Sequence, residues 1–369
     1  MKKDVVDALS GRFPGRVPTK ETLNHPGILR QVSGVDPWDD PVTAFSETWR
    51  RLSIDVHVAP PGPAEAPCAY PEPGGTARRP KAPGGTWVEE GWRFADIGVM
   101  PTSVRIEYLP RLDRSAEDWV FAYDPAEDDF HLAEETALLR RQNAAFRDFY
   151  GELAVHYASY YTTLFMWPVV KFDWEPFLCA AALDPERFDE RFWQPWAEIS
   201  RKHVEALAAI DEEVVFTHDD LSMTTGPVFS PRFYERYIFP RYERIWEPLI
   251  DAGKRLVFIS DGNIEPFLER LLEFPIAAIM FENPATPFER VLATWGRAGR
   301  GFIGGISTQV LTNGTPEEVA EHTRGVIERG REHPGFVLSS CGGLHGNIPM
   351  ANIRAYFETR NRMGIPAEL

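Results

Sequence analysis

The chain has 369 residues, 43% of them hydrophobic and 25% charged, so its composition is that of a globular protein with a large core. Its 39 basic and 55 acidic residues give a formal net charge of −16, which argues against a nucleic-acid partner. Three cysteines are too few for a disulfide framework, and no apolar run has the length of a signal peptide or of a membrane span. These features predict a cytoplasmic protein that binds neither nucleic acid nor membrane.

The first 150 residues contain few regular patterns. A helix is expected from about Asp4, and a second over Pro41–Leu52. An extended run follows at Ile54–Val58. The sequence alone does not show how these elements join the rest of the chain.

Residues 59–85 are dense in proline and glycine and contain almost no apolar residues. They are expected to form a long surface loop inserted into a single domain that spans residues 1–369. Two strands are expected after this loop, Trp87–Trp92 and Ser103–Leu109. We interpret them as a hairpin over the mouth of the barrel that the remaining sequence predicts.

From about residue 155, short apolar strands alternate with longer amphipathic stretches, as in βα units around a parallel sheet. Some strands are almost continuously apolar, such as Leu256–Ile259, which indicates burial on both faces. The pattern predicts an α/β fold, a (β/α)8 TIM barrel. The expected strands are Tyr160–Trp167, Val214–His218, Arg255–Ser260, Ala277–Glu282, Gly301–Ile306 and Phe336–Ser340.

Two of the expected helices have the same start signal. Thr315-Pro316 and Thr286-Pro287 each place a hydroxyl at the N-cap, proline at the first helical position and glutamate three residues after the cap. The hydroxyl is expected to accept a hydrogen bond from a free backbone N–H group in the first turn.

Polar residues follow four of the expected strands. Parallel strands of a barrel all end on the same side, so these residues are expected to meet at its mouth. Thiolate, imidazole and carboxylate are ligands of zinc, although the long spacing here matches no compact zinc motif. The candidate metal ligands are His218, Asp261, Glu282 and Cys341. The alternative is structural: Asp261 would bond to backbone N–H groups of its turn, and Cys341 would be a small buried residue.

The adjacent carboxylates Asp219 and Asp220 are candidates for catalytic acid–base work. Consecutive residues at a strand end point in opposite directions, so one is expected to face the mouth and the other to brace a loop toward Gly226. The candidate substrate-binding residues are Tyr160, Trp167, Asn263 and His345. The two aromatic ones belong to a cluster that is otherwise expected to be core.

Six segments of the chain, in this order and spacing, carry a family resemblance: Gly15–Pro18, Asp219-Asp220 followed by Gly226–Pro231, Phe258–Ile264, Gly304–Ile306, Gly314–Val319 and Ser340–Ile353. Together they resemble the uroporphyrinogen decarboxylase superfamily, which also contains corrinoid- and cobalamin-dependent methyltransferases. The resemblance implies the same barrel that the strand pattern predicts.

Within that superfamily, the decarboxylases carry an Arg-Gln-Ala-Gly-Arg segment near the N-terminus for the carboxylates of their substrate, and this chain has none. The methyltransferase branch is more similar, because Cys341 falls on its second zinc cysteine. Its other ligands come from a His-x-Cys-Gly sequence. Aligned on Gly262, this chain has Ile259 in place of that histidine and Asp261 in place of that cysteine.

A carboxylate-bearing zinc site is a harder Lewis acid than a thiolate-rich one, which favours a substrate bound through oxygen. The resemblance therefore implies a methyltransferase that demethylates a small methylated compound with zinc, the methyl acceptor being a corrinoid on a partner protein. Two alternatives stay open: a metal-free decarboxylase that uses Asp219 or Asp220, and a non-catalytic barrel that binds a ligand or a corrinoid protein. A homodimer is compatible with the sequence, which does not decide the oligomeric state.

Overall fold

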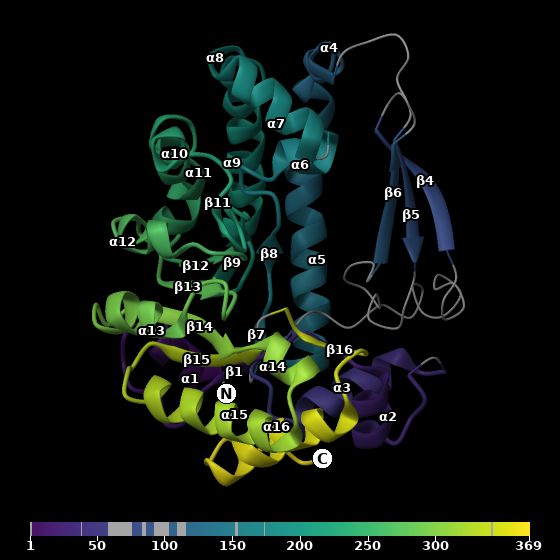
Figure 1. Ribbon diagram of the computed structural model, residues 1–369, viewed down its shortest axis with the longest axis vertical. Helices are drawn as coiled ribbons and strands as arrows, with labels where there is room; N and C mark the ends of the chain where they lie inside the picture. The colour runs from purple at the N-terminus through teal and green to yellow at the C-terminus, as the bar shows by residue number, and fades with distance from the viewer. Residues whose placement is uncertain are drawn as a thin grey trace.

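The structure is a computed structural model that describes residues 2–37, 39–57, 76–82, 86–91, 103–108, 116–151, 154–172, 174–340 and 342–369. Within these ranges, nine strands form one parallel sheet in the order β7-β3-β1-β15-β14-β13-β12-β9-β8 (Figure 1). The two end strands, β7 (Val155–His156) and β8 (Ser159–Tyr160), are consecutive parts of one extended segment. The sheet therefore closes on itself, and the expected TIM barrel is confirmed.

The other barrel strands are β1 (Thr19–Lys20), β3 (Val56–His57), β9 (Val214–His218), β12 (Arg255–Ser260), β13 (Ala278–Phe281), β14 (Gly301–Ile306) and β15 (Phe336–Ser340). The last five agree with the strands expected from the sequence to within one residue at each end. β1 was not expected, because two residues carry no periodic pattern. Its place is fixed by pairing with β15 on one side and β3 on the other.

The strand expected over Tyr160–Trp167 is wrong except at its first residue. The chain turns after β8, and α6 (Trp167–Phe172) begins where the strand was expected to end. The backbone N–H groups of residues 164–166 all donate to the buried carboxylate of Asp219, over 2.6–2.7 Å. That carboxylate provides hydrogen-bond acceptors for backbone amides just ahead of the helix, so the apolar residues after Tyr160 form a turn rather than a strand.

The side chains inside the barrel form a core of their own. Alternate strand residues point inward, and α1 (Lys2–Ala8) closes the end where the strands begin, which we call the amino face. Val5, Ala8 and Leu9 pack there against the barrel interior. The inward-facing core residues are Val56, Val155, Val214, Phe216, Val257, Ile259, Ala278, Met280, Ile303 and Val337.

A larger core lies between the barrel and its helices, in which five tryptophans are at most 1% exposed. The main helices are α2 (Pro26–Ser33), α3 (Pro41–Arg51), α5 (Leu132–Tyr150), α7 (Trp174–Leu183), α9 (Gln194–Ala208), α10 (Pro231–Tyr237), α11 (Phe239–Asp251), α14 (Thr308–Asn313), α15 (Pro316–Gly330) and α16 (Met350–Arg362). The shorter ones are α4 (Ala116–Phe121), α8 (Pro185–Phe188), α12 (Leu268–Leu271) and α13 (Phe288–Val291).

One of the two predicted threonine caps is present. Thr315 accepts from the amide of Glu318, and the Glu318 side chain accepts in return from the amide of Thr315 at the start of α15. Thr286 does not cap α13. Its hydroxyl donates to the carbonyl of Gly262 and accepts from the amide of Ile264, both over 2.8 Å, so it ties the loop after β13 to the loop after β12.

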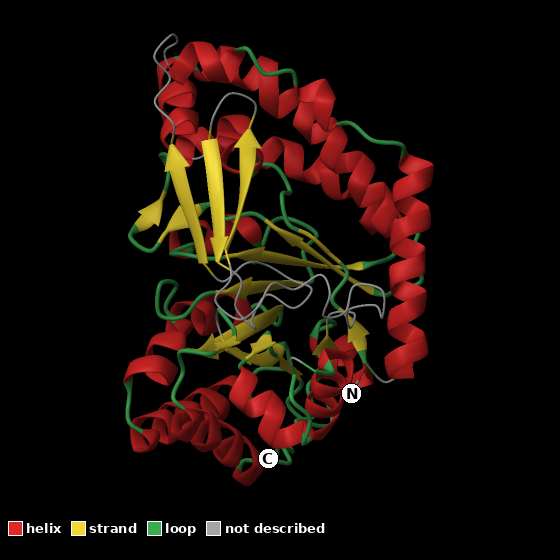
Figure 2. Ribbon diagram, turned by 90° about the vertical axis from the view of Figure 1, so that its right-hand side faces the viewer, coloured by secondary structure: helices red, strands yellow, loops and turns green. Residues whose placement is uncertain are grey.

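A separate antiparallel sheet consists of β4 (Thr76–Ala82), β5 (Thr86–Gly91) and β6 (Ser103–Tyr108), and stands to one side of the barrel (Figures 1 and 2). The expected hairpin is confirmed as β5–β6. β4 corrects the expectation that all of residues 59–85 form a loop, and the rest of that segment lies outside the described residues. Its Pro80 is tolerated because β4 is an edge strand whose register shifts after that residue. A position over the mouth stays a prediction.

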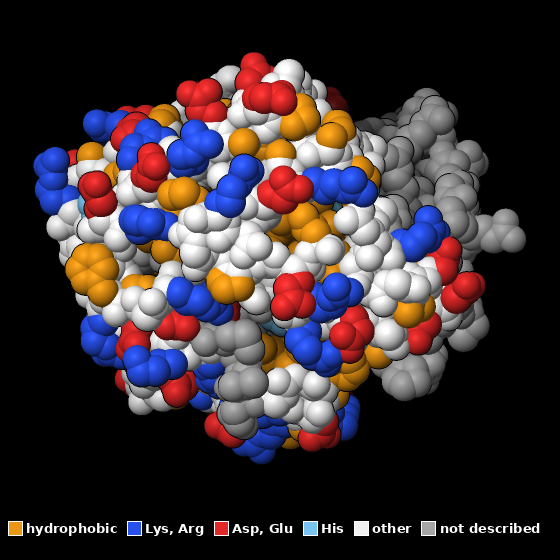
Figure 3. Space-filling model, turned by 90° about the horizontal axis from the view of Figure 1, so that it is seen from below, with side chains coloured by type: hydrophobic (Ala, Val, Ile, Leu, Met, Phe, Trp, Pro, Cys, Tyr) orange, Lys and Arg blue, Asp and Glu red, His pale blue; other side chains and the backbone are white. Residues whose placement is uncertain are grey.

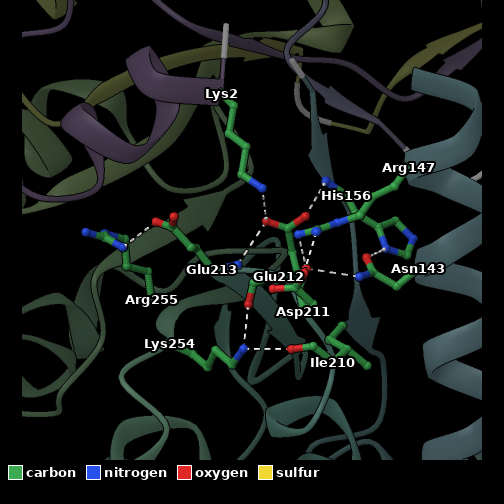
Figure 4. A network of polar contacts seen from close by, with 10 residues as sticks. All are labelled: Lys2, Asn143, Arg147, His156, Ile210, Asp211, Glu212, Glu213, Lys254 and Arg255. Carbon is green, nitrogen blue, oxygen red and sulfur yellow. Dashed lines mark hydrogen bonds and ion pairs between the residues drawn. The ribbon is translucent and has the colours of Figure 1, made fainter. Parts of the chain in front are cut away.

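Charged groups at the amino face are paired (Figure 4). The buried carboxylate of Glu212 receives Lys2 Nζ at 3.0 Å and the amide of His156 at 3.5 Å. Lys254 Nζ donates to the carbonyls of Ile210 and Glu212 at 2.7 and 2.8 Å. This network joins α1 to the loops in front of β9 and β12.

The surface seen in Figure 3 mixes basic and acidic side chains, with apolar ones scattered between them. This face therefore presents no broad surface of a single charge sign. Among the described helices, none combines the length and the apolar character needed to span a membrane.

Candidate functional site

Three potential metal ligands come together at the mouth, the end where the barrel strands finish. His218 ends β9, Asp220 follows two residues later, and Asp261 follows β12; one ligand atom of each lies within 4.8 Å of the other two. His218 Nε2 is 2.8 Å from Asp220 Oδ1, which also accepts from the amide of Asp261 at 2.9 Å. His218 pairs with Ile259 in the sheet. Asp261 comes two residues after Ile259, so it lies on the same inner face of the barrel but closer to the mouth.

The three groups titrate abnormally because they are buried side by side. Burial and the negative charge of Asp220 raise the pKa of Asp261 to about 6, although His218 and Lys20 oppose this. Burial lowers the pKa of His218, but the hydrogen bond and charge of Asp220 outweigh it, so the net pKa is raised. Burial raises the pKa of Asp220, yet His218 brings the net value below the ordinary one. His218 and Asp220 thus favour each other's charged forms, and Asp261 is the surplus carboxyl group.

This donor set fits a divalent metal. An imidazole and two carboxylates are ligands that zinc accepts, and a catalytic zinc keeps a further position open for substrate. Asp220, Asp261 and Glu282 are three carboxylates in this region. The positive charges that act on Asp261 are those of His218 and Lys20. A dication would balance the carboxylate charges and would favour the ionised form of Asp261, whose pKa is raised by burial and by its acidic neighbours.

The other predicted ligands are placed differently. Glu282 Oε2 accepts from the amide of Gly262 at 3.1 Å, and among the described residues Glu282 is not in the three-ligand group. Its charge still raises the pKa of Asp261. Cys341 lies outside the described residues. Gly262 has φ +74°, and a Cβ there would lie 2.2 Å from the carbonyl of Ser222, so the turn that carries Asp261 requires glycine.

Of the two predicted catalytic carboxylates, only Asp220 faces the mouth. Asp219 is fully buried on the opposite side, where it accepts from Tyr242 Oη at 2.7 Å and from three backbone amides. Burial raises its pKa to about 7, although these donors favour the ionised form. The two neighbours therefore point apart, as the strand alternation predicts, but the braced segment is the start of α6 rather than the loop toward Gly226.

The two aromatic residues predicted to bind substrate point away from the mouth. The Tyr160 hydroxyl lies 2.9 Å from Ser200 Oγ of α9, and its ring stacks on His203 at 4.2 Å. The Trp167 Nε1 donates to the same Ser200 oxygen over 2.9 Å. Both side chains belong to the layer between barrel and helices.

Asn263 and His345, also predicted to bind substrate, have local partners. Asn263 Oδ1 accepts from the amide of Glu265 at 3.1 Å, at the start of a short helical turn. His345 lies on β16 (Leu344–His345), which pairs with β2 (Leu23–Asn24), and its Nδ1 accepts from the amide of Asn347 at 3.3 Å. Among the described residues, neither belongs to the group of His218, Asp220 and Asp261.

Two residues that sequence reasoning did not select lie at the site. Lys20 pairs in register with Ser339 and Val56 on the inner wall, and its Nζ is 5.2 Å from the centroid of the Tyr157 ring. Tyr161 presents its ring to His218, with centroids 4.6 Å apart and planes at 77°, and burial and the charge of Asp220 raise the pKa of its hydroxyl. The sequence signal for Tyr161 is indirect: successive side chains of an extended segment point to opposite faces, so an outward-facing Tyr160 implies an inward-facing Tyr161.

The sequence model of a family described as uroporphyrinogen decarboxylase (URO-D) matches residues 174–363, which is more than half of the chain. The chain belongs to the uroporphyrinogen decarboxylase family. The matched part of this family member contains β9 to β15 and all three residues of the candidate metal site. A comparison with curated proteins found no match.

Comparison with solved structures supports the fold through one neighbour. A "methyltransferase from Methanosarcina mazei" superposes with a TM-score of 0.64 at 12% identity, over 98% of each chain, which supports the fold. A D-psicose 3-epimerase in the presence of D-fructose has a TM-score of 0.32 at 13% identity, covering 67% of this chain and 85% of its own. A D-psicose 3-epimerase with D-tagatose from Clostridium cellulolyticum H10 has 0.34 at 9%, covering 70% and 95%. The two epimerases are too dissimilar to bear on function.

Proposed function

We propose that this protein is a methyltransferase that removes an oxygen-bound methyl group from a small molecule, with zinc held by His218, Asp220 and Asp261. The observation that carries the proposal is the convergence of these ligand atoms at the mouth of the barrel. Family membership and the fold shared with a methyltransferase from Methanosarcina mazei support it. Glu282 and Cys341 are proposed as additional ligands.

The ligand types indicate the substrate atom. A site dominated by one imidazole and carboxylates is harder than the thiolate-rich zinc sites of related methyltransferases, so oxygen is the preferred donor at the coordination position left for substrate. When bound, zinc would polarise the ether or alcohol oxygen as a Lewis acid. The bond between the methyl carbon and oxygen breaks, its electron pair stays on oxygen, and the methyl group passes to a nucleophilic acceptor. We propose a reduced corrinoid on a partner protein as that acceptor.

The chain's own residues would assist the departing oxygen. Lys20 contributes a positive charge on the inner wall close to Asp261, which favours negative charge developing nearby. Tyr161 contacts His218 with its ring and lies close enough to Asp220 to feel its charge, so it would help to keep two ligands in place.

Metal analysis of the purified protein tests this assignment. We expect about one equivalent of zinc per chain, and less than about a tenth of that in His218→Ala and Asp261→Ala. Glu213→Gln at the amino face is the matched control, because it also changes an acidic side chain in front of a barrel strand and is expected to keep its zinc. Demethylation of a methoxylated compound, followed with a reduced corrinoid, should fall with the zinc content.

The alternative of a metal-free decarboxylase rests on Asp220 alone, since Asp219 braces α6. It predicts turnover that survives chelators and needs no corrinoid. Full activity in zinc-free protein would favour it and contradict the proposed methyltransferase. The third candidate, a non-catalytic barrel, predicts ligand binding without turnover in either assay.

A further inference from the structure

One wall of the barrel interior is formed by alternate residues of the extended segment that contains β7 and β8. Tyr157 points inward, with its ring centroid 4.6 Å from that of Phe216 in the barrel core. Ser159 pairs in register with the same Phe216, and Tyr161 lies against His218. Tyr160 points outward to α9. Tyr157, Ser159 and Tyr161 therefore follow one another up the inner wall at a spacing of roughly 7 Å.

The middle residue of this row is open to solvent. Ser159 is exposed, whereas Tyr157 below it is partly buried. α1 closes the amino face of the same barrel. A small, solvent-exposed side chain thus lies between two phenol rings on the inner wall, and we call this position the Ser159 recess.

The recess adjoins the metal ligands. Ser159 and Tyr161 belong to the segment that pairs with β9, the strand that ends in His218. On the other side of His218, the hairpin of β10 (Ser222–Met223) and β11 (Gly226–Pro227) carries Met223, which is 41% exposed. The carbonyl of Met223 accepts from the amide of Asn263 at 2.9 Å, which holds the hairpin beside the turn of Asp261. Apolar surface therefore flanks the ligands on two sides.

We propose that the Ser159 recess binds the aromatic ring of an aryl methyl ether and directs its ether oxygen toward His218 and Asp261. A planar ring matches a gap the size of one missing side chain between two aromatic ones, where edge and face contacts with tyrosine are favourable. The Ser159 hydroxyl is available to a polar ring substituent. The orientation of the ether oxygen rests on the proposed function, whereas the ring site rests on the wall residues alone.

Binding of two matched probes to the zinc-loaded, full-length protein tests the ring site. Anisole and methoxycyclohexane have the same heavy atoms, but only anisole is planar. We expect calorimetry to show anisole binding at least about 10-fold more tightly. Ser159→Leu, which fills the recess, should weaken anisole binding by about 10-fold or more, and Tyr161→Ala should weaken it about 5-fold and reduce the preference for the planar probe. Ser159→Ala and Phe13→Ala, the latter an exposed aromatic at the amino face, should bind anisole like the wild type.

The outcomes separate the ring site from the metal proposal. Equal affinity for the two probes overturns the ring site, as does a folded Ser159→Leu protein with unchanged anisole binding. If Ser159→Leu does not fold, as judged by circular dichroism, Tyr161→Ala decides the question, and unchanged anisole binding in it overturns the ring site. A wild-type protein that holds no zinc contradicts the proposed function, and anisole binding that persists in that protein leaves the ring site intact.

Discussion

The two ends of the barrel handle charge in opposite ways. At the amino face, Glu212 is buried with Lys2 and backbone amides as partners, and Lys254 bonds two carbonyls (Figure 4). At the mouth, burial raises the pKa of Asp261, and the nearby carboxylates of Asp220 and Glu282 raise it further. Matched charges fix elements in place, whereas crowded like charges cost stability and are retained at sites that bind something. The contrast favours the mouth as the candidate functional end on charge alone.

The largest effect on stability is expected at the amino face. Glu212→Ala removes the partner of Lys2 and of two backbone amides, and should lower the free energy of unfolding by about 3 kcal/mol in urea titrations. Glu213→Gln is the control. The Glu213 side chain, which pairs with Arg255, is 56% exposed, so the substitution should change the free energy of unfolding by less than about 0.5 kcal/mol. Similar losses in both variants would contradict the contrast between buried and exposed pairs.

A second effect is pH-dependent. Burial, helped by the charge of Arg147, lowers the pKa of His156 to about 4, so the folded state holds it neutral. Its ordinary value is about 6.5, so its contribution to stability is complete above that pH and is lost as the pH falls toward 4. We expect a loss on the order of 2 kcal/mol from this residue between pH 7 and pH 5. Urea unfolding of wild type and His156→Asn at pH 7, 6 and 5 measures it, and parallel pH profiles would disprove it.

The smallest effect has the opposite sign and belongs to the mouth. In chelator-treated protein, Asp261→Asn removes one of several crowded negative charges and should raise the free energy of unfolding by about 1 kcal/mol. Added zinc should then stabilise the wild type more than the variant. A variant less stable than the metal-free wild type would show that Asp261 is structural, as the alternative interpretation of its turn holds.

Much of the fold was predictable because the later barrel strands are long apolar runs that end in polar residues. β1, β7 and β8 are only two residues long, and their places depend on pairing with strands far away in sequence. No local pattern could show this. For the same reason Lys20, which belongs to β1 and pairs with β15 and β3, was missed as part of the site.

The sequence indicated which residue types lie at the candidate site, but not which side chains point into the barrel. His218 and Asp261 follow from their positions at strand ends. The sequence favoured Tyr160, whereas the structure points Tyr161 toward His218, because inward and outward residues alternate and the phase of that alternation is set by the register of β8 on β9. Register is a property of two segments, so a single stretch of sequence does not contain it.

The helix α1 that closes the amino face has a kinetic consequence. Among the described residues, α1 closes one end of the barrel, so molecules reach His218 and Asp261 from the mouth. Under the proposed function, a small methyl donor would have to enter before a protein partner covers the mouth, and the demethylated product would leave after that partner departs. The proposed function therefore predicts an ordered sequence of binding and release.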